Sequence, residues 1–168
     1  AEKLSWEDIR GSAERYDWPQ TKEVDPASFM GRMNARTGSQ YAFDLPTEAQ
    51  WEHACRAGTT TQWSFGDSEH EADDYAWYER TSSRSTHDVG LKKANPFGLF
   101  DMHGNVWEWC LDRYGSYPRE AQTDPPGATS GWYRVWRGGG WGSSDMVIRS
   151  AQRSGHTPDS RAIHAGFR

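Results

Sequence analysis

The chain has 168 residues and a formal charge of −5, and no run of lysine or arginine gathers positive charge on one segment. This length is sufficient for one hydrophobic core, and the charge argues against a nucleic-acid partner held by phosphate contacts. No segment has the roughly 20 apolar residues that a bilayer-spanning helix requires, so the sequence predicts no membrane insertion.

Ten tryptophans and seventeen glycines in a chain that is only 35% hydrophobic predict a core built from aromatic rings. An indole buries a large area on few rotatable bonds, so such cores suit folds with long loops and little regular structure. Cys55 and Cys110 are too few for a disulfide scaffold and occur in unlike surroundings. We expect buried free thiols, with a disulfide or a metal role as alternatives, and the cellular compartment stays open.

The amino-terminal part predicts two helical segments separated by an insertion. Ser5 can cap a short helix that starts at Trp6 and ends before Gly11, and the polar residues 11–24 then interrupt the pattern. Asp25 as the cap and Pro26 at the first helical position predict a second helix, which ends at Gly38.

The next helix has the strongest start signal in the chain. Thr47 and Gln50 form a capping box, and the helix is expected to run to Gly58 with Trp51 and Cys55 on one face. After it, turn residues separate short pieces rich in tryptophan and tyrosine, of which residues 106–110, 133–137 and 166–168 are the expected strands. We therefore predict an α+β fold with two helices plus short antiparallel strands.

Residues 98–109, Gly-Leu-Phe-Asp-Met-His-Gly-Asn-Val-Trp-Glu-Trp, place Asp101 and Glu108 on either side of a glycine turn. Carboxylate and backbone oxygens of such a turn could surround a hard cation, and calcium prefers an oxygen cage. The alternative is a structural hairpin in which the aspartate caps a turn and the glutamate pairs with an arginine. His103 is interpreted as a packing or surface residue and is left out of the metal site.

The glycine turn at residues 138–140 predicts a close approach by another part of the chain, since glycine has no Cβ. The polar residues 142–165 that follow could form a binding loop. Arginines near the tryptophans are expected to be structural, stacking on rings and binding loop carbonyls. No nucleophile elbow, phosphate-binding loop or zinc-protease helix occurs, which excludes the corresponding hydrolases, kinases and proteases.

Four motifs in this order resemble the formylglycine-generating enzyme, or sulfatase-modifying factor, family. They are residues 45–58, residues 95–109, Arg-Val-Trp-Arg-Gly-Gly-Gly-Trp at 134–141, and the terminal Gly-Phe-Arg at 166–168. The resemblance covers roughly residues 40–168 and implies a variant of the C-type lectin fold. We expect a single domain over residues 1–168, with a divergent amino-terminal part at 1–39 that contains the insertion at about 11–24.

The resemblance implies a structural calcium ion bound by the side chains of Asp101 and Glu108 and by the carbonyls of Gly104 and Val106. All four positions hold suitable residues, although some members have asparagine in place of Asp101. A second calcium site of the family, near Trp77, is not carried over because its carboxylate position has no counterpart.

The oxidase members of the family convert a cysteine of a sulfatase peptide to formylglycine, with copper held by two cysteines shortly after a Gly-Gly-Ser turn. Residues 142–153 contain no cysteine, and Cys55 and Cys110 lie in other motifs. A cuprous ion needs thiolate ligands, so we expect no copper and no oxidase chemistry of this kind. The chain also departs from the family at Gly140 and Asp44, and most of the usual amino-terminal region is missing.

The first hypothesis is therefore a calcium-supported domain whose carboxyl-terminal loop binds a protein or peptide, as in the related variable proteins diversified by retroelements. Its expected ligand-binding residues are polar or aromatic and lie in or beside residues 142–165: Trp141, Ser143, Ser144, Asp145, His156, Ser160 and His164. The alternative is an oxidoreductase of the same family acting on a protein or small-molecule thiol, with the two histidines as first suspects. A structural or regulatory partner domain is the third possibility.

Overall fold

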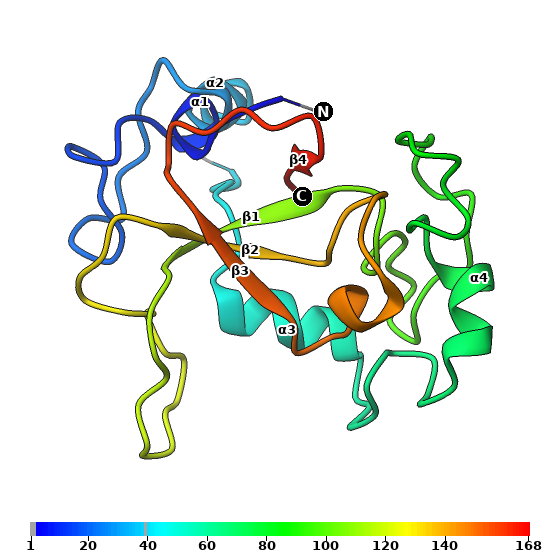
Figure 1. Ribbon diagram of the computed structural model, residues 1–168. Coiled ribbons are helices and arrows are strands. Elements are labelled where there is room, and N and C mark those ends of the chain that lie inside the picture. Colours follow the sequence, from blue (N-terminus) through cyan, green and yellow to red (C-terminus); the bar gives the residue numbers. More distant parts are fainter. Residues whose placement is uncertain (1–2, 39) are drawn as a thin grey trace.

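The computed structural model describes residues 3–38 and 40–168. In chain order these residues form α1 (Trp6–Arg10), α2 (Phe29–Arg36), α3 (Glu48–Arg56), the 3₁₀ turn η1 (Glu69–Glu71), α4 (Ala72–Tyr75), β1 (Trp107–Arg113), β2 (Arg134–Arg137), the 3₁₀ turn η2 (Asp145–Ile148), β3 (Arg153–His156) and β4 (Ala165–Gly166). Long irregular segments connect them (Figure 1). The predicted α+β class with little regular structure is confirmed. No helix in the described part of the chain is long and apolar enough to cross a membrane.

Two helices begin at the caps that the sequence predicts. The Ser5 hydroxyl accepts the Asp8 N–H at 3.0 Å at the start of α1, and the Thr47 hydroxyl accepts the Gln50 N–H at 3.2 Å at the start of α3. In both helices the return bond of the capping box is also present. Local sequence therefore determines where these two helices begin.

The predicted start of α2 at Pro26 was wrong, because the helix begins at Phe29 and its cap is Ser28. The Asp25 carboxylate instead accepts the N–H of Ala27 at 2.8 Å and closes a turn around the proline. Aspartate before proline favours either structure, and here the turn is formed. Residues 1, 2 and 39, which bound the predicted amino-terminal part, lie outside the described residues.

The sheet has the strand order β3-β2-β1-β4. β1 and β2 are antiparallel, as are β2 and β3, whereas β4 runs parallel to β1. The prediction of antiparallel strands was therefore wrong for the last strand, since residues 157–164 carry the chain across the sheet before it returns beside β1. Strand β3, Arg-Ser-Gly-His, was not predicted because it contains no β-branched or large apolar residue.

Helices cover both faces of the sheet, and side chains of β1 alternate between them. Trp109 and Leu111 pack with Trp6 of α1, whereas Cys110 packs with Trp51 of α3. Figure 1 shows the corresponding layers, with α1 and α2 above the sheet and α3 below it. The aromatic core predicted from composition is confirmed, since Trp6, Trp51 and Trp109 are at most 1% exposed.

Buried arginines connect this sheet to the loops. The Arg134 guanidinium lies 4.3 Å from the Trp6 ring centroid and pairs with Asp17 at 2.5 Å. The Arg137 guanidinium lies 5.2 Å from the Trp51 ring and donates to the Ser150 carbonyl at 2.7 Å. The structural role predicted for the arginines is thus confirmed for both residues.

Candidate functional site

The turn at residues 98–106 has a backbone that few sequences can adopt. Asp101 and Asn105 have φ angles of 56° and 62°, in the left-handed region that these two residue types tolerate. A Cβ at Gly104 would lie 2.2 Å from the Trp77 carbonyl oxygen, so only glycine fits. The Asn105 amide exchanges two hydrogen bonds of 3.1 Å with the backbone of His87. These contacts fix the direction of the carbonyl groups in the turn.

The structure brings all four predicted calcium ligands together. Asp101, Gly104, Val106 and Glu108 line one cavity of about 340 Å³. Asp101 Oδ2 accepts the Gly90 N–H at 2.8 Å, whereas Oδ1 is buried and has no hydrogen-bond partner among the described residues. A buried carboxylate oxygen without a donor is unusual, and a hard cation would satisfy it.

Glu108 at the other end of the turn is paired with an arginine, as the structural alternative expects. Its two oxygens accept from Arg168 at 2.6 Å each, and Oε2 also accepts the Trp51 indole N–H at 2.6 Å. Oε1 receives only the one bond among the described residues, and a carboxylate oxygen has two lone pairs. The ion pair therefore leaves Glu108 one position for a further cation.

No group of three or more histidine, cysteine, aspartate or glutamate side chains in the described ranges is arranged to hold a metal ion. A cation in the turn at residues 98–106 would thus depend on backbone carbonyls in addition to its two carboxylates. The donor set is entirely oxygen, which fits calcium and does not fit a soft metal.

The glycine turn packs tightly, as predicted, and it is joined to the turn at residues 98–106. A Cβ at Gly139 would lie 2.7 Å from the Ile148 side chain. The Gly138 carbonyl accepts the Gly104 N–H at 2.8 Å, and the Trp141 N–H donates to the Asn105 carbonyl at 2.8 Å. Two backbone hydrogen bonds thus connect the first turn to the start of the predicted binding loop.

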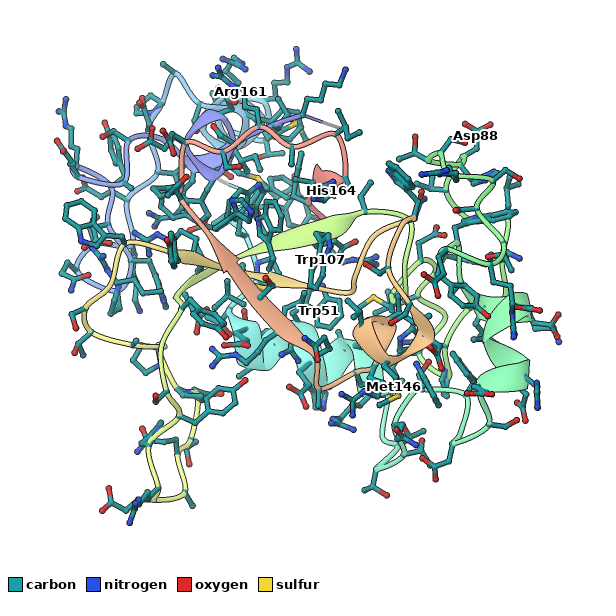
Figure 2. The ribbon with its side chains drawn as sticks, viewed as in Figure 1. Trp51, Asp88, Trp107, Met146, Arg161 and His164 are labelled. Atoms are coloured by element: carbon teal, nitrogen blue, oxygen red, sulfur yellow. The ribbon has the colours of Figure 1, made fainter. Side chains whose placement is uncertain are left out.

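Three of the predicted ligand-binding residues lie along one face of the sheet. The exposed ring of His156 stacks on the buried Trp136 with the centroids 4.3 Å apart, and His164 meets the same indole edge-on at 5.8 Å. Ser143 reaches this face through Gly140, whose N–H its hydroxyl accepts at 3.0 Å. In Figure 2, Trp107 lies between His164 and Trp51 in the middle of the molecule.

The surroundings of His164 disfavour its charged form. Burial lowers the pKa of His164, and the neighbouring His156 lowers it further. The imidazole of His164 is therefore neutral at neutral pH, and it can both donate and accept a hydrogen bond. We call the surface formed by Trp107, Trp136, Ser143, His156 and His164 the histidine face.

The other four predicted ligand-binding residues are not shown to contact this face. The carbonyl of Trp141 accepts the Ser82 hydroxyl at 2.7 Å, and that of Asp145 accepts the Trp63 indole N–H at 3.3 Å. Ser144 is the cap residue of η2, and Ser160 lies in a turn after β3, where its N–H donates to the Thr157 carbonyl at 3.0 Å. Their part in binding stays a prediction.

Both cysteines are free and buried, as expected. Burial raises the pKa of Cys55 to about 12 and that of Cys110 well above its ordinary value, so neither forms a thiolate at neutral pH. Cys55 Sγ lies 3.8 Å from His103 Nε2, which is also 2.9 Å from the Ser64 hydroxyl. Since Ser64 and His103 are at most 3% exposed, this group is part of the core and confirms the packing interpretation of His103.

Sequence reasoning missed a second polar cluster at the start of α3. Glu48 is 4% exposed and pairs with Arg137 at 3.1 Å and with Arg153 at 2.6 Å. Its backbone N–H donates to the Asp112 carboxylate at 2.7 Å. Nothing in the spacing of these residues indicates the contact, because they come from four different elements, α3, β1, β2 and β3.

The comparison with known families decides which proteins this chain is related to. The model of the sulfatase-modifying factor enzyme 1-like domain, FGE-sulfatase, matches residues 2–168. The chain belongs to this family. The resemblance inferred from the four motifs is thereby confirmed.

Several individual relatives support this assignment. The chain is 37% identical over 141 residues to the formylglycine-generating enzyme of Streptomyces coelicolor, covering 74% of this chain and 45% of the relative. It is 42% identical over 129 residues to the serine/threonine-protein kinase pkn1 of Chlamydia caviae, covering 74% of this chain and 20% of the relative. The chain thus spans less than half the length of these relatives.

Among solved structures, the chain is similar to Treponema denticola variable protein 1, with a TM-score of 0.71 and 41% identity. The likeness covers 74% of this chain and 45% of that structure. Relatives of the domain therefore include formylglycine-generating enzymes and a protein described as variable.

Proposed function

We propose that this domain binds a protein or peptide ligand through the histidine face, on a scaffold ordered by a calcium ion in the turn at residues 98–106. The observation that carries this proposal is the exposed His156 ring, which stacks at 4.3 Å on an indole buried in the centre of the sheet. A ring held in this way loses little conformational entropy when a ligand binds. The likeness to a variable protein supports the same role.

Calcium is proposed because the residues present fit a hard cation. Asp101 Oδ1 is buried without a donor, and the carbonyl-bearing residues Gly104 and Val106 line the same cavity. When bound, the ion would neutralise Asp101, share Glu108 with Arg168 and stiffen the turn. Hydrogen bonds from Gly104 and to Asn105 then hold the glycine turn, which leads into the histidine face.

Oxidation by a copper–thiolate centre is the less favoured function. Both thiols are buried and their pKa values are raised, which opposes metal binding and nucleophilic attack by either cysteine. The sequence 142–153, which follows the glycine turn, contains no cysteine. No observation on the histidine face favours a redox reaction over ligand binding.

The test is a selection of random phage-displayed peptides that bind the purified domain in buffer containing calcium. Affinities of enriched synthetic peptides are then measured by fluorescence anisotropy for the parent, for the double variant His156→Ala/His164→Ala, and for His70→Ala as an exposed control. We expect the double variant to lose at least about tenfold in affinity, the effect of removing an interface hot spot, and the control to lose none.

Equal affinity for the parent and the double variant would contradict the proposed surface. A parallel assay incubates the domain with cuprous ion, oxygen and a cysteine-containing sulfatase peptide and searches for formylglycine by mass spectrometry. Product formation there would favour the oxidase alternative over the binding function.

A further inference from the structure

A second cavity lies on the opposite side of β3 from the histidine face, between α3 and the segment that joins β1 to β2. We call residues 115–128 of this segment the arm; Figure 1 shows it as the yellow-green loop that extends away from the sheet. The cavity has a volume of about 340 Å³, within the range of small-ligand sites. Its apolar wall includes Ala49, Tyr117, Pro118, Pro125, Pro126 and Ala128.

The arm is held over this cavity by specific bonds rather than by chance packing. The Tyr117 hydroxyl donates to Glu48 at 3.0 Å, and Arg153 donates to the Gly115 carbonyl at 2.6 Å. The Arg153 guanidinium lies between two rings, 4.1 Å from Tyr117 and 4.6 Å from Tyr114. The cavity therefore has fixed walls on both sides.

One carboxylate in the cavity lacks a positive partner. Arg153 is paired with Glu48 at 2.6 Å, and Arg137 is paired with Glu48 and Glu52 at 3.1 and 2.5 Å. Asp112 is only 2% exposed, lines the cavity and forms no ion pair within the described ranges. A buried carboxylate without a counter-ion is costly, so this position favours a cation.

The two oxygens of Asp112 are not equivalent. Oδ2 accepts the Glu48 N–H at 2.7 Å, and in the described part of the chain no other residue donates to Oδ1. The arm passes beside Oδ1 at Gly127, where an added Cβ would lie only 2.8 Å from that oxygen. Since glycine lacks this atom, the arm can lie against Asp112 without placing a side chain on Oδ1, and both residues line the cavity. Burial, with Glu48 nearby, raises the pKa of Asp112 to about 6, so the group is charged at neutral pH.

These features select the ligand by its chemistry. An anion would face the unpaired Asp112, and the arginines beside it are already engaged with Glu48 and Glu52. His53 also lines the cavity, but no side-chain group suited to a metal occurs in the described ranges, and much of the remaining wall is proline, alanine and tyrosine ring. A metal ion is therefore disfavoured. A guanidinium prefers two acceptor oxygens side by side, whereas an ammonium needs only one.

We propose that the cavity under the arm binds a primary ammonium group on a short apolar stem, with Asp112 as its counter-ion. The stem would pack against the proline and tyrosine wall while the ammonium donates to Oδ1. A lysine side chain of a partner and a free alkylamine share this chemistry. The site does not involve the histidine face or the calcium turn.

The test is a titration of the ¹⁵N-labelled domain at pH 7 with n-butylamine, with butyrate as the isosteric anion, followed through the backbone amides of the arm. We expect saturable shifts at Gly115 and Gly127 with butylamine and none with butyrate. Because the pKa of Asp112 is about 6, butylamine affinity should fall about tenfold between pH 7 and pH 5. Equal binding of both compounds, or no saturable shift with either, would overturn the proposal.

Two variants locate the site and one serves as control. Asp112→Asn keeps an acceptor for the Glu48 N–H but removes the charge, and it should lose at least tenfold in butylamine affinity. Ala49→Leu fills the cavity from a position on helix α3 and should also lose at least tenfold in butylamine affinity. This variant keeps the test valid if Asp112→Asn folds poorly. Glu120→Gln, an exposed arm residue outside the cavity lining, should bind as the parent does. Unchanged affinity in Asp112→Asn would sink the proposal.

A third ligand distinguishes the source of the ammonium. Nα-acetyl-lysine amide presents the same group as a peptide does, and binding at least as tight as that of butylamine would assign the cavity to a lysine of a partner protein. Tighter binding of butylamine would assign it to a free amine. Removing calcium, or changing His156 and His164, should leave the affinities for butylamine and Nα-acetyl-lysine amide unchanged. The ammonium site can therefore fail or succeed independently of the proposed function.

Discussion

At the scale of single residues, burial decides which titratable groups can act. His103 Nδ1 donates to the Ile148 carbonyl at 2.7 Å, so this nitrogen carries the proton, because a carbonyl only accepts. Nε2 is then an acceptor for the Ser64 hydroxyl. The imidazole is thus locked in one neutral tautomer. Burial lowers the pKa of His103 to about 4, mainly because the charged form is desolvated.

This shift predicts an acid-sensitive core. The pKa of His103 is lower in the folded chain than its ordinary value of 6.5, so the unfolded chain binds the proton more readily, and stability is complete above pH 6.5 and lost as pH falls toward 4. We expect His103→Gln, which cannot ionise, to lose less stability on acidification. The difference in free energy of unfolding between parent and variant should narrow by about 2 to 3 kcal/mol between pH 7 and pH 4.5 in urea titrations.

The exposed His70 provides the matched control, since His70→Gln should change the pH dependence very little. The variants must be compared with the parent because Asp112 has the opposite effect on the pH dependence of stability from that of His103. The raised pKa of Asp112 means that folding favours the protonated carboxyl. The contribution of this group to the free energy of unfolding therefore declines as pH rises through about 6. A parallel pH profile for the parent and His103→Gln would show that the histidine is not responsible.

At the scale of elements, the turn at residues 98–106 contains an unsatisfied oxygen that a bound cation would pair. Asp101 Oδ1 is buried without a donor among the described residues, which costs free energy when no ion is present. The turn is also bonded to the glycine turn. The glycine turn leads into the segment that carries Ser143.

Calcium should raise the melting temperature of the parent through this turn. At a free concentration one hundred times its Kd, a ligand contributes about 2.7 kcal/mol, or roughly 5 to 10 °C for a domain of this size. We expect Asp101→Gly, which suits the positive φ but removes the ligand, to lose this calcium-induced shift in a thermal melt. Asp88→Gly, at a nearby exposed residue, should keep it. An equal calcium-induced shift in both variants would show that Asp101 does not bind the ion.

The elements also show what the sequence could predict. Helix α3 was predicted from Thr47 and Gln50 because a capping box is a local signal. The start of α2 was wrong, since Asp25 supports a turn as well as a cap, and β3 was missed because its pairing with β2 depends on the whole sheet. The four residues predicted as calcium ligands could be named from motifs, and they do line one cavity. The Glu48–Asp112 contact joins distant segments and could not be predicted.

At the scale of the whole molecule, the predicted insertion at residues 11–24 is part of the structural framework. Asp17 in this segment pairs with Arg113 of β1 at 2.6 Å and with Arg134 of β2 at 2.5 Å. The Trp18 indole N–H donates to the Pro126 carbonyl of the arm at 3.1 Å. A segment that interrupts a helix thus connects the sheet to the arm.

Removing this anion should destabilise the entire fold. Arg134 is 1% exposed, and Asp17→Asn would leave its guanidinium buried without a counter-ion, a change that costs about 3 kcal/mol. We expect a corresponding loss in the free energy of unfolding measured in urea. Glu14→Gln, an exposed residue of the same segment, is the control and should stay within about 0.5 kcal/mol of the parent. A loss below about 1 kcal/mol for Asp17→Asn would mean that the segment is dispensable.

The indoles of the sheet have a spectroscopic consequence. Trp136 lies 4.7 Å from Trp109 and 6.2 Å from Trp107 between ring centroids, with interplanar angles of 73° and 29°. At such separations the electronic transitions of neighbouring rings couple, and the fixed angles between them make the coupling chiral. The folded sheet should therefore give an exciton couplet in its circular dichroism spectrum. Because His156 stacks on Trp136, a ligand that moves the histidine would change that couplet without any label.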